Sequence, residues 1–226
     1  MSEEKQEGLD ITERIDRAEH YVRDNKKSLT IIGGAAVAVI AAYFGYNQFI
    51  VKPQEENAQK EMFVAERYFD QDSTNLAIKG DGSYPGFEEI TANYGSSHSG
   101  NLAQYYLGIS CLKKGEYAKA IEALKSYDAE DDVTGALALG GIGSANLELG
   151  NADEALKYYK KAADWDENNF TRPLFLMKTA IVLEDKKDFK GALAIYEQIK
   201  KDFPTSTEAR DIDKYIGRAE ALSGGN

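Results

Sequence analysis

The stretch "IGSANLELGNADEALKYYKKA", Ile142 to Ala162, decides the fold of this 226-residue chain. A Leu-Gly-Asn turn around Gly150 separates two segments rich in helix-forming residues. Each segment holds a small residue, Gly143 in the first and Ala155 in the second, and small residues let two helix backbones approach closely. No residue between Leu149 and Ala162 suggests catalysis. The stretch therefore predicts two antiparallel helices joined by a glycine turn.

The same pattern occurs in two further stretches, Leu107 to Tyr127 and Thr179 to Ile199. When the three are aligned, small residues coincide once in the first helix (Gly108, Gly143, Ala180) and once in the second (Ala120, Ala155, Ala192). Larger residues follow at one shared position (Leu124, Tyr159, Tyr196), and glycines mark two turns (Gly115, Gly150). The spacing of about 35 residues is the length of a helix-turn-helix repeat. We therefore expect an all-α fold of stacked helix pairs.

These residues resemble the tetratricopeptide repeat. The third stretch matches most fully, through Ala180, Phe189, Ala192, Tyr196 and Pro204, whereas the second has Ala152 where the family places an aromatic residue. The resemblance implies an α-solenoid of about three to four helix pairs closed by a C-terminal capping helix. The expected units are about 58–94, 101–134, 136–169 and 173–206, with the cap at 207–222. The first is degenerate and interrupted by "GDGSYPG".

A second organising feature is the uncharged segment from Leu29 to Val51. Its 23 residues would form roughly 35 Å of helix, enough to cross a hydrocarbon core of about 30 Å. It is followed by Lys52 and Pro53 and shows no cleavage site, so we interpret residues 29–51 as a retained transmembrane anchor. A buried core helix is the alternative, but most of the remaining chain is too polar to surround it.

The charges around the anchor predict its orientation. Five basic residues precede it closely and two follow at similar distance: Arg14, Arg17, Arg23, Lys26 and Lys27 before, Lys52 and Lys60 after. Basic flanks stay in the cytoplasm. Residues 1–28 are therefore expected to be a cytoplasmic arm, with a short amphipathic helix at about 11–25, and residues 52–226 to lie outside. Gly34, Ala38 and Ala42 could contact another membrane helix, or could simply reflect how common small residues are in anchors.

Composition excludes several classes of function. A formal net charge of −11 disfavours nucleic acid, which requires a basic face. Cys111 is the single cysteine, so neither an intramolecular disulfide nor a thiol-pair metal site can form. "GGIGSA" at Gly140 to Ala145 lacks the third glycine of a dinucleotide-binding loop, and we interpret it as helix packing. His98 has serine neighbours but no acidic partner apparent in the sequence, and His20 is expected to lie on the other side of the membrane.

No catalytic, cofactor-binding or metal-binding residues are therefore expected, and the chain is predicted not to be an enzyme. In the family that the repeats resemble, the first helices of the units line a concave groove. The matching positions predict a mostly apolar partner-binding groove formed by Leu102, Tyr105, Ile109, Leu112, Ser144, Leu174, Met177 and Ile181. The Lys, Arg and Asn residues with which some relatives hold a C-terminal carboxylate are absent. Such a groove suits an extended or helical apolar segment of a partner protein.

The combination of basic arm, single anchor and acidic external repeat domain is similar to the bacterial inner-membrane, YfgM-type ancillary subunits of the SecYEG translocon. This narrower resemblance implies a periplasmic repeat domain at residues 52–226 that links the translocon to a periplasmic chaperone. Expected partners are translocon subunits, a chaperone or secreted chains, together with the bilayer. An envelope-assembly or cell-division scaffold using the same fold is the alternative. The oligomeric state and the role of the arm stay open.

Overall fold

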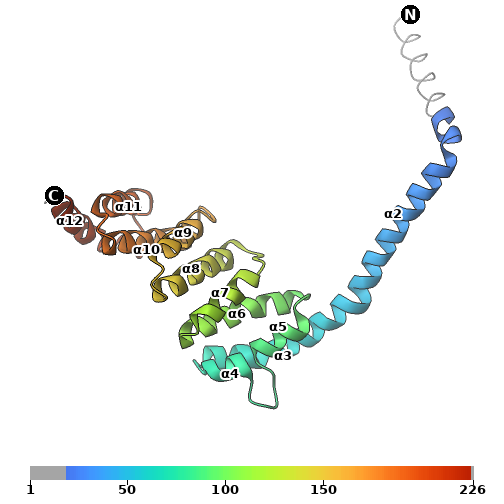
Figure 1. Cartoon of the computed structure of the whole chain (residues 1–226), viewed down its shortest axis with the longest axis horizontal. Helices are drawn as coiled ribbons and strands as arrows, with labels where there is room; N and C mark the ends of the chain where they lie inside the picture. Colours follow the sequence, from blue (N-terminus) through green and yellow to red (C-terminus); the bar gives the residue numbers. More distant parts are fainter. Residues whose placement is uncertain (1–18, 225–226) are drawn as a thin grey trace, which may run out of the picture. The chain divides into compact units, whose positions relative to one another are not determined.

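The computed structural model describes residues 19–224, and every regular element in that range is a helix (Figure 1). Of the amphipathic helix expected at about 11–25, residues 19–24 are helical, Asn25 is in a turn, and residues 11–18 lie outside the described residues. The elements are α2 Lys26–Tyr46, the π-helix η1 Asn47–Val51, α3 Lys52–Asp70, α4 Thr74–Lys79, α5 Phe87–Tyr94, α6 His98–Lys114, α7 Tyr117–Ser126, α8 Asp132–Glu148, α9 Ala152–Ala163, α10 Thr171–Asp185, α11 Phe189–Asp202 and α12 Ile212–Ser223.

The chain divides into two compact units between Pro53 and Gln54. In the first unit, α2 has no buried residue, and large apolar side chains such as Ile31 and Phe44 are exposed. Helical residues continue from Lys26 to Asp70, and by length and composition this is the one helix in the described range that could cross a membrane. A surface that is apolar on every side is energetically favourable in lipid and unfavourable in water.

The apolar segment ends inside a helix. Pro53 has no backbone N–H and its ring would clash with the carbonyl group one turn earlier. The chain widens into the π-helical turn Asn47–Val51 just before it, with the Lys52 N–H donating to the Asn47 carbonyl oxygen. A π-bulge of this kind accommodates the proline without ending the helix.

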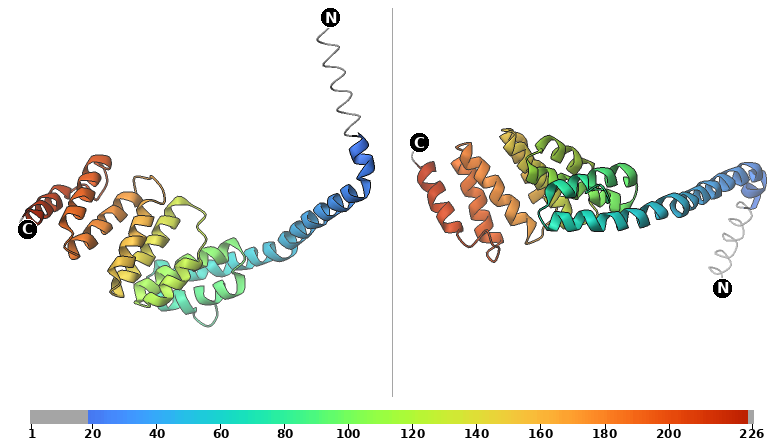
Figure 2. Two further views of the ribbon diagram at one scale, coloured as in Figure 1. Left: turned by 45° about the horizontal axis from the view of Figure 1, so that its top comes forward. Right: turned by 90° about the horizontal axis from the view of Figure 1, so that it is seen from below.

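The second unit is a row of antiparallel helix pairs (Figures 1 and 2). The pairs α6/α7, α8/α9 and α10/α11 follow one another, preceded by α3, α4 and α5 and followed by α12. One apolar cluster spans α8 to α12 and includes the fully buried Ala180, Ala192 and Tyr196. The all-helical solenoid of tetratricopeptide-like pairs predicted from the sequence is thus confirmed for the described residues.

Close helix approaches occur at the small residues of the repeat. A Cβ atom added at Gly108 would lie 2.4 Å from Leu124 Cγ, and one at Gly143 would lie 2.7 Å from Tyr159 Cδ1 and 3.3 Å from the Ala155 carbonyl oxygen. Ala120, Ala155 and Ala192 are all 0% exposed. The alignment of the three stretches therefore reflects the side chains that fill each helix crossing.

The turns within the pairs need a left-handed residue. Gly115 has φ +83° and Gly150 has φ +80°, which glycine adopts without steric cost. The corresponding position in the third pair is Lys187, which has φ +64°. A side chain with a Cβ atom is strained there, so the third pair carries a local cost that the other two avoid.

Lys187→Gly is therefore expected to stabilise the protein by about 0.5–1 kcal/mol, because relief of the left-handed strain outweighs the added chain entropy of glycine. Gly150→Lys should destabilise it by a similar amount. Thermal unfolding of the full chain in detergent, followed by circular dichroism, measures both. A lower midpoint for Lys187→Gly would contradict the strain argument.

The segment before the regular pairs contains three helices rather than two. Met62 and Ala65 of α3, Ala77 of α4, and Phe87 and Ile90 of α5 share one buried cluster. The "GDGSYPG" loop joins α4 to α5, and the Asp81 carboxylate accepts hydrogen bonds from the backbone N–H groups of Ser83 and Tyr84, both at 2.8 Å. The shortness of α4, six residues, distinguishes this segment from the later pairs.

The solenoid ends with α12, which begins at Ile212 after turns that follow Pro204. Its buried residues, Ile212 and Ala219, join the cluster of α8 to α11. Arg218 on α12 forms an ion pair with Glu184 of α10. One face of α12 thus covers apolar surface that the last pair would otherwise expose.

Candidate protein-interaction site

The eight predicted groove residues lie on α6, α8 and α10, the first helices of the three pairs. Seven of them are half-buried, and Ile181 is 39% exposed. Leu102, Leu112, Leu174 and Met177 pack at the margins of the apolar clusters. The Ser144 hydroxyl accepts a hydrogen bond from the Tyr159 hydroxyl at 3.1 Å. Of the set, Ile181 has the largest exposed fraction.

Tyr105 and Ile109 lie where α6 meets the next pair. Ile109 Cδ1 is 3.5 Å from the point that a Gly141 Cβ would occupy, so the glycine leaves room for it. The Tyr105 ring lies 5.5 Å from that of Tyr127 and 5.7 Å from that of Tyr106. Burial raises the pKa of the Tyr105 hydroxyl to about 12, which keeps it protonated and neutral. Both side chains therefore pack between units as well as facing the first-helix side.

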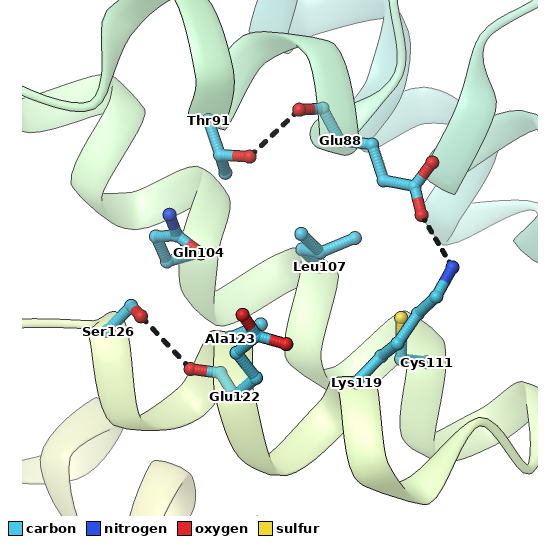
Figure 3. A pocket seen from close by; sticks show the side chains of 9 residues that line it. All are labelled: Glu88, Thr91, Gln104, Leu107, Cys111, Lys119, Glu122, Ala123 and Ser126. Atoms are coloured by element: carbon cyan, nitrogen blue, oxygen red, sulfur yellow. Dashed lines mark hydrogen bonds and ion pairs between the residues drawn. The ribbon is translucent and has the colours of Figure 1, made fainter.

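A pocket of about 290 Å³ lies between α5, α6 and α7 (Figure 3). Glu88 of α5 and Lys119 of α7 pair across it at 3.1 Å. Its other lining residues are Thr91, Gln104, Leu107, Cys111, Glu122, Ala123 and Ser126. Burial raises the pKa of the Cys111 thiol to about 11, and a protonated thiol is a poor nucleophile. The pocket therefore offers polar and apolar contacts without a reactive group.

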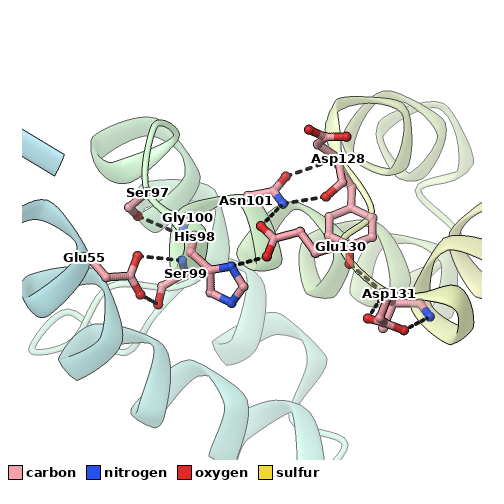
Figure 4. Close-up of polar contacts among 11 residues, drawn as sticks. Glu55, Ser97, His98, Ser99, Gly100, Asn101, Asp128, Glu130 and Asp131 are labelled. Atoms are coloured by element: carbon pink, nitrogen blue, oxygen red, sulfur yellow. Dashed lines mark hydrogen bonds and ion pairs between the residues drawn. The ribbon is translucent and has the colours of Figure 1, made fainter. Parts of the chain in front are cut away.

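His98 has an acidic partner, contrary to the sequence-based expectation. Its Nδ1 lies 2.5 Å from Glu130 Oε2, although 32 positions separate the two residues (Figure 4). The nearby Ser99 does not complete a triad, because its hydroxyl donates to Glu55 Oε1 at 2.6 Å. Both side chains of the His98–Glu130 pair are about half exposed, so the pair adds little stability and supplies no enclosed catalytic site.

Further hydrogen bonds connect the start of α6, near His98, to the loop after α7 (Figure 4). The Asn101 side chain donates to the Asp128 carbonyl oxygen at 2.7 Å and accepts from its N–H at 2.8 Å. Burial tends to raise the pKa of the Glu55 carboxyl, but the hydrogen bonds from Ser99 outweigh it and hold the pKa below its ordinary value. The network holds the Tyr127–Asp131 loop against the start of α6, and we interpret it as structural.

The glycines of "GGIGSA" are packing positions. A Cβ at Gly140 would lie 1.9 Å from Phe175 Cε1, and those at Gly141 and Gly143 would meet Leu124 and Tyr159. Within residues 19–224 no three His, Cys, Asp or Glu side chains are grouped closely enough to hold a metal ion. The arrangement offers a partner packing surfaces, hydrogen-bonding groups and charge.

The Glu88–Lys119 pocket is not predicted by the repeat pattern of the sequence. Lys119 belongs to a recognisable unit, but Glu88 lies in the irregular segment before it, where no repeat spacing predicts the position of a side chain. The His98–Glu130 pair was missed for a related reason, because it joins the start of α6 to the loop after α7.

Three sequence models of the tetratricopeptide repeat match the chain, at residues 87–133, 136–169 and 175–206. The matched ranges fall on α5 to α11, which include the three helix pairs α6 to α11 in which the packing of small residues repeats.

Two curated proteins are similar over part of the chain. Tetratricopeptide repeat protein 29 of Macaca fascicularis and that of Homo sapiens are each 33% identical to it over 94 residues, which is 39% of this chain. The match spans 20% of the length of those proteins. Two crystal structures from Podosopora anserina, described as "kinesin light chain nearly identical TPR-like repeats", align with a TM-score of 0.58 at 14% and 13% identity. The alignments cover 75% of this chain and 88% of the length of those chains. At this identity, they show a similar fold.

Proposed function

The chain is a tetratricopeptide repeat protein, and we propose that it is a membrane-anchored adaptor that links the Sec translocon to a periplasmic chaperone. Tetratricopeptide repeats are protein-protein interaction modules, and that much follows from the repeats themselves. The observation that carries the rest of the proposal is the coexistence, in one chain, of the exposed apolar helix α2 and a repeat domain with its own buried clusters.

Burial and charge support the anchoring. No residue of α2 is buried against the rest of the chain, so its apolar surface needs another environment, and a bilayer supplies it. The basic residues before the span and the acidic character of the chain after it favour a cytoplasmic N-terminus and a periplasmic repeat domain. This combination resembles the architecture of the YfgM-type translocon subunits, and we propose the translocon and chaperone partners from that resemblance.

The topology is tested by adding protease to intact spheroplasts. We expect digestion after Lys52 and protection of the first 25 residues, detected with a tag at the N-terminus. Lysed spheroplasts are the control, because both sides then become accessible. Protection of the repeat domain in intact spheroplasts, with loss of the N-terminal tag, would overturn the orientation.

The partner is tested by crosslinking in native membranes followed by mass spectrometry. Translocon and periplasmic chaperone peptides crosslinked to residues 54–226 would support the adaptor. Crosslinks to peptidoglycan enzymes or division proteins instead would favour the alternative, an envelope-assembly or cell-division scaffold. A chain in which α2 is replaced by an unrelated membrane helix separates contacts made by the repeats from contacts made by the anchor.

A further inference from the structure

A second cleft, of about 310 Å³, lies between α7, α8 and α9. Its volume is at the lower end of the range of about 300–1,000 Å³ found for ligand pockets. The side chains that line it are of three kinds. Leu124, Ala138, Leu139 and Ile142 are aliphatic, Tyr127, Tyr158 and Trp165 are aromatic, and Lys125, Lys161 and Asp128 are charged. We call this the Trp165 cleft.

Trp165 is positioned by a glycine. A Cβ atom at Gly135 would lie 2.4 Å from Trp165 Cε2, so the indole rests directly on the α8 backbone. Trp165 is nevertheless 45% exposed. A half-exposed aromatic ring fixed on a backbone loses little conformational entropy on binding, which is the property of an anchor for a ligand.

Three lysine side chains surround the aromatic ring of Tyr158. The ammonium nitrogens of Lys125, Lys157 and Lys161 lie 5.9, 6.0 and 5.4 Å from the centre of the Tyr158 ring. Lys157 also pairs with Glu154 at 3.2 Å. Among the described residues, Lys125 and Lys161 have no carboxylate within 4.0 Å. In a chain of net charge −11, this is a local concentration of positive charge beside an apolar surface.

The fold does not require these residues. The Glu88–Lys119 pocket of Figure 3 is the same site one repeat earlier. Four lining residues of the two sites correspond at a spacing of 35 positions. They are Gln104 and Leu139, Leu107 and Ile142, Ala123 and Tyr158, and Ser126 and Lys161. Since the earlier unit packs with alanine and serine where the later has Tyr158 and Lys161, stacking of the repeats does not explain the aromatic and basic residues.

We propose that the Trp165 cleft binds an extended segment of a partner protein in which a large apolar side chain is flanked by an acidic residue. The apolar side chain packs on Leu139, Tyr158 and Trp165, the half-buried or exposed apolar side chains of the cleft. The neighbouring carboxylate pairs with Lys125 and Lys161, whose charges are otherwise uncompensated by nearby carboxylates in the described chain.

The Trp165 edge of the cleft sets the polarity of the segment. Trp165 also borders an adjoining hollow of about 250 Å³ lined by Ala129, Glu130, Asp131 and Asp132, and Asp128 lines the cleft itself. A second carboxylate of the partner would be repelled from this edge. The cleft therefore selects a segment with negative charge on one side of the apolar anchor only.

This site goes beyond the proposed adaptor function. None of the eight predicted groove residues lines the Trp165 cleft or the Glu88–Lys119 pocket. The cleft is formed by the second helices α7 and α9 across α8, so a segment could bind it whichever protein the groove contacts.

Selection from a random library tests the chemistry directly. Phages displaying random 12-residue peptides are panned on the full chain in lipid nanodiscs, and in parallel on Tyr158→Ala/Lys161→Ser. This variant carries the residues that the preceding repeat has at the same positions, so it is expected to fold. Peptides with Asp or Glu beside Leu, Ile, Phe, Tyr or Trp should be enriched on the natural chain and not on the variant.

The best selected peptide is then synthesised and titrated, with Trp165 as the reporter, since it is the single tryptophan of the chain. We expect a blue shift of its emission and at least a tenfold higher Kd for the variant. Lys201→Ser, on α11, is the control with the same change in charge. An absence of enriched peptides, a basic consensus, or equal binding by the variant would each overturn the proposal. Because the readout is local to Trp165, none of these results bears on the translocon proposal.

Discussion

Ala155→Leu is expected to lower the free energy of unfolding of the repeat domain by about 1–3 kcal/mol, the usual cost of overpacking a core. Ala155 is 0% exposed, and its carbonyl oxygen lies 3.3 Å from the place where a Gly143 side chain would begin. The two helices touch here through backbone and Cβ atoms. A leucine side chain can be accommodated only if α9 moves away from α8, which would also disturb the buried Tyr159.

Thermal unfolding of the full chain in detergent measures the effect. For a domain of this size, each kcal/mol corresponds to a decrease in Tm of roughly 2–4 °C. Ala194→Leu is the matched control, because Ala194 is an exposed alanine on the second helix of the next pair. It should leave Tm nearly unchanged. If Ala155→Leu behaves like the control, the helix crossing is not at Ala155.

The helix pairs could be predicted because a repeat imposes the same packing at each crossing. Gly108, Gly143 and Ala180 recur since a larger side chain would separate the helices at that point, and Gly150 recurs because the turn requires positive φ. These are local requirements visible in one stretch and confirmed by its copies. The exception, Lys187, could not be recognised as strained from the sequence, since lysine is an ordinary residue after a helix.

The segment from α3 to α5 was harder to predict because its packing does not repeat. The cluster of Met62, Ala77 and Phe87 joins three helices of different lengths. Nothing in the spacing of these residues indicates that α4 has only six residues. The π-helical turn before Pro53 was also missed, because a proline after an apolar run more often indicates that a helix ends.

The candidate sites required knowledge of neighbouring units. Helical periodicity predicts which side of α6 Ile109 occupies, but the space that receives it comes from Gly141, 32 residues later. The Trp165 cleft is similar, because α7 contributes Lys125, α8 contributes Ile142, and Trp165 follows α9. A single repeat cannot show that these three side chains meet. Surfaces formed between repeats are therefore the part of such a protein that its sequence pattern predicts least.

Ile109→Asp and Ile181→Asp are expected to have opposite consequences, although periodicity places both residues in the groove. Ile109 packs at the margin of the cluster formed by Leu124, Ala138 and Ile142. An aspartate there would lose hydration without gaining a partner, and we expect destabilisation by more than about 2 kcal/mol. Ile181 is 39% exposed, so an aspartate should change stability by no more than about 0.5 kcal/mol.

Ile181→Asp is expected to weaken partner binding while leaving stability nearly unchanged, so it is the informative change. If the first helices form the contact surface, an exposed apolar residue of α10 buries its side chain against the partner, and replacing it with a charge should weaken binding at least tenfold. The measurement is the yield of the partner crosslink in native membranes, with circular dichroism of the purified variant as the test of folding. A folded Ile181→Asp chain that keeps its full crosslink yield would exclude this part of the groove. The contact would then lie elsewhere on the chain, and combining Ile181→Asp with Tyr158→Ala/Lys161→Ser would test whether the Trp165 cleft supplies it.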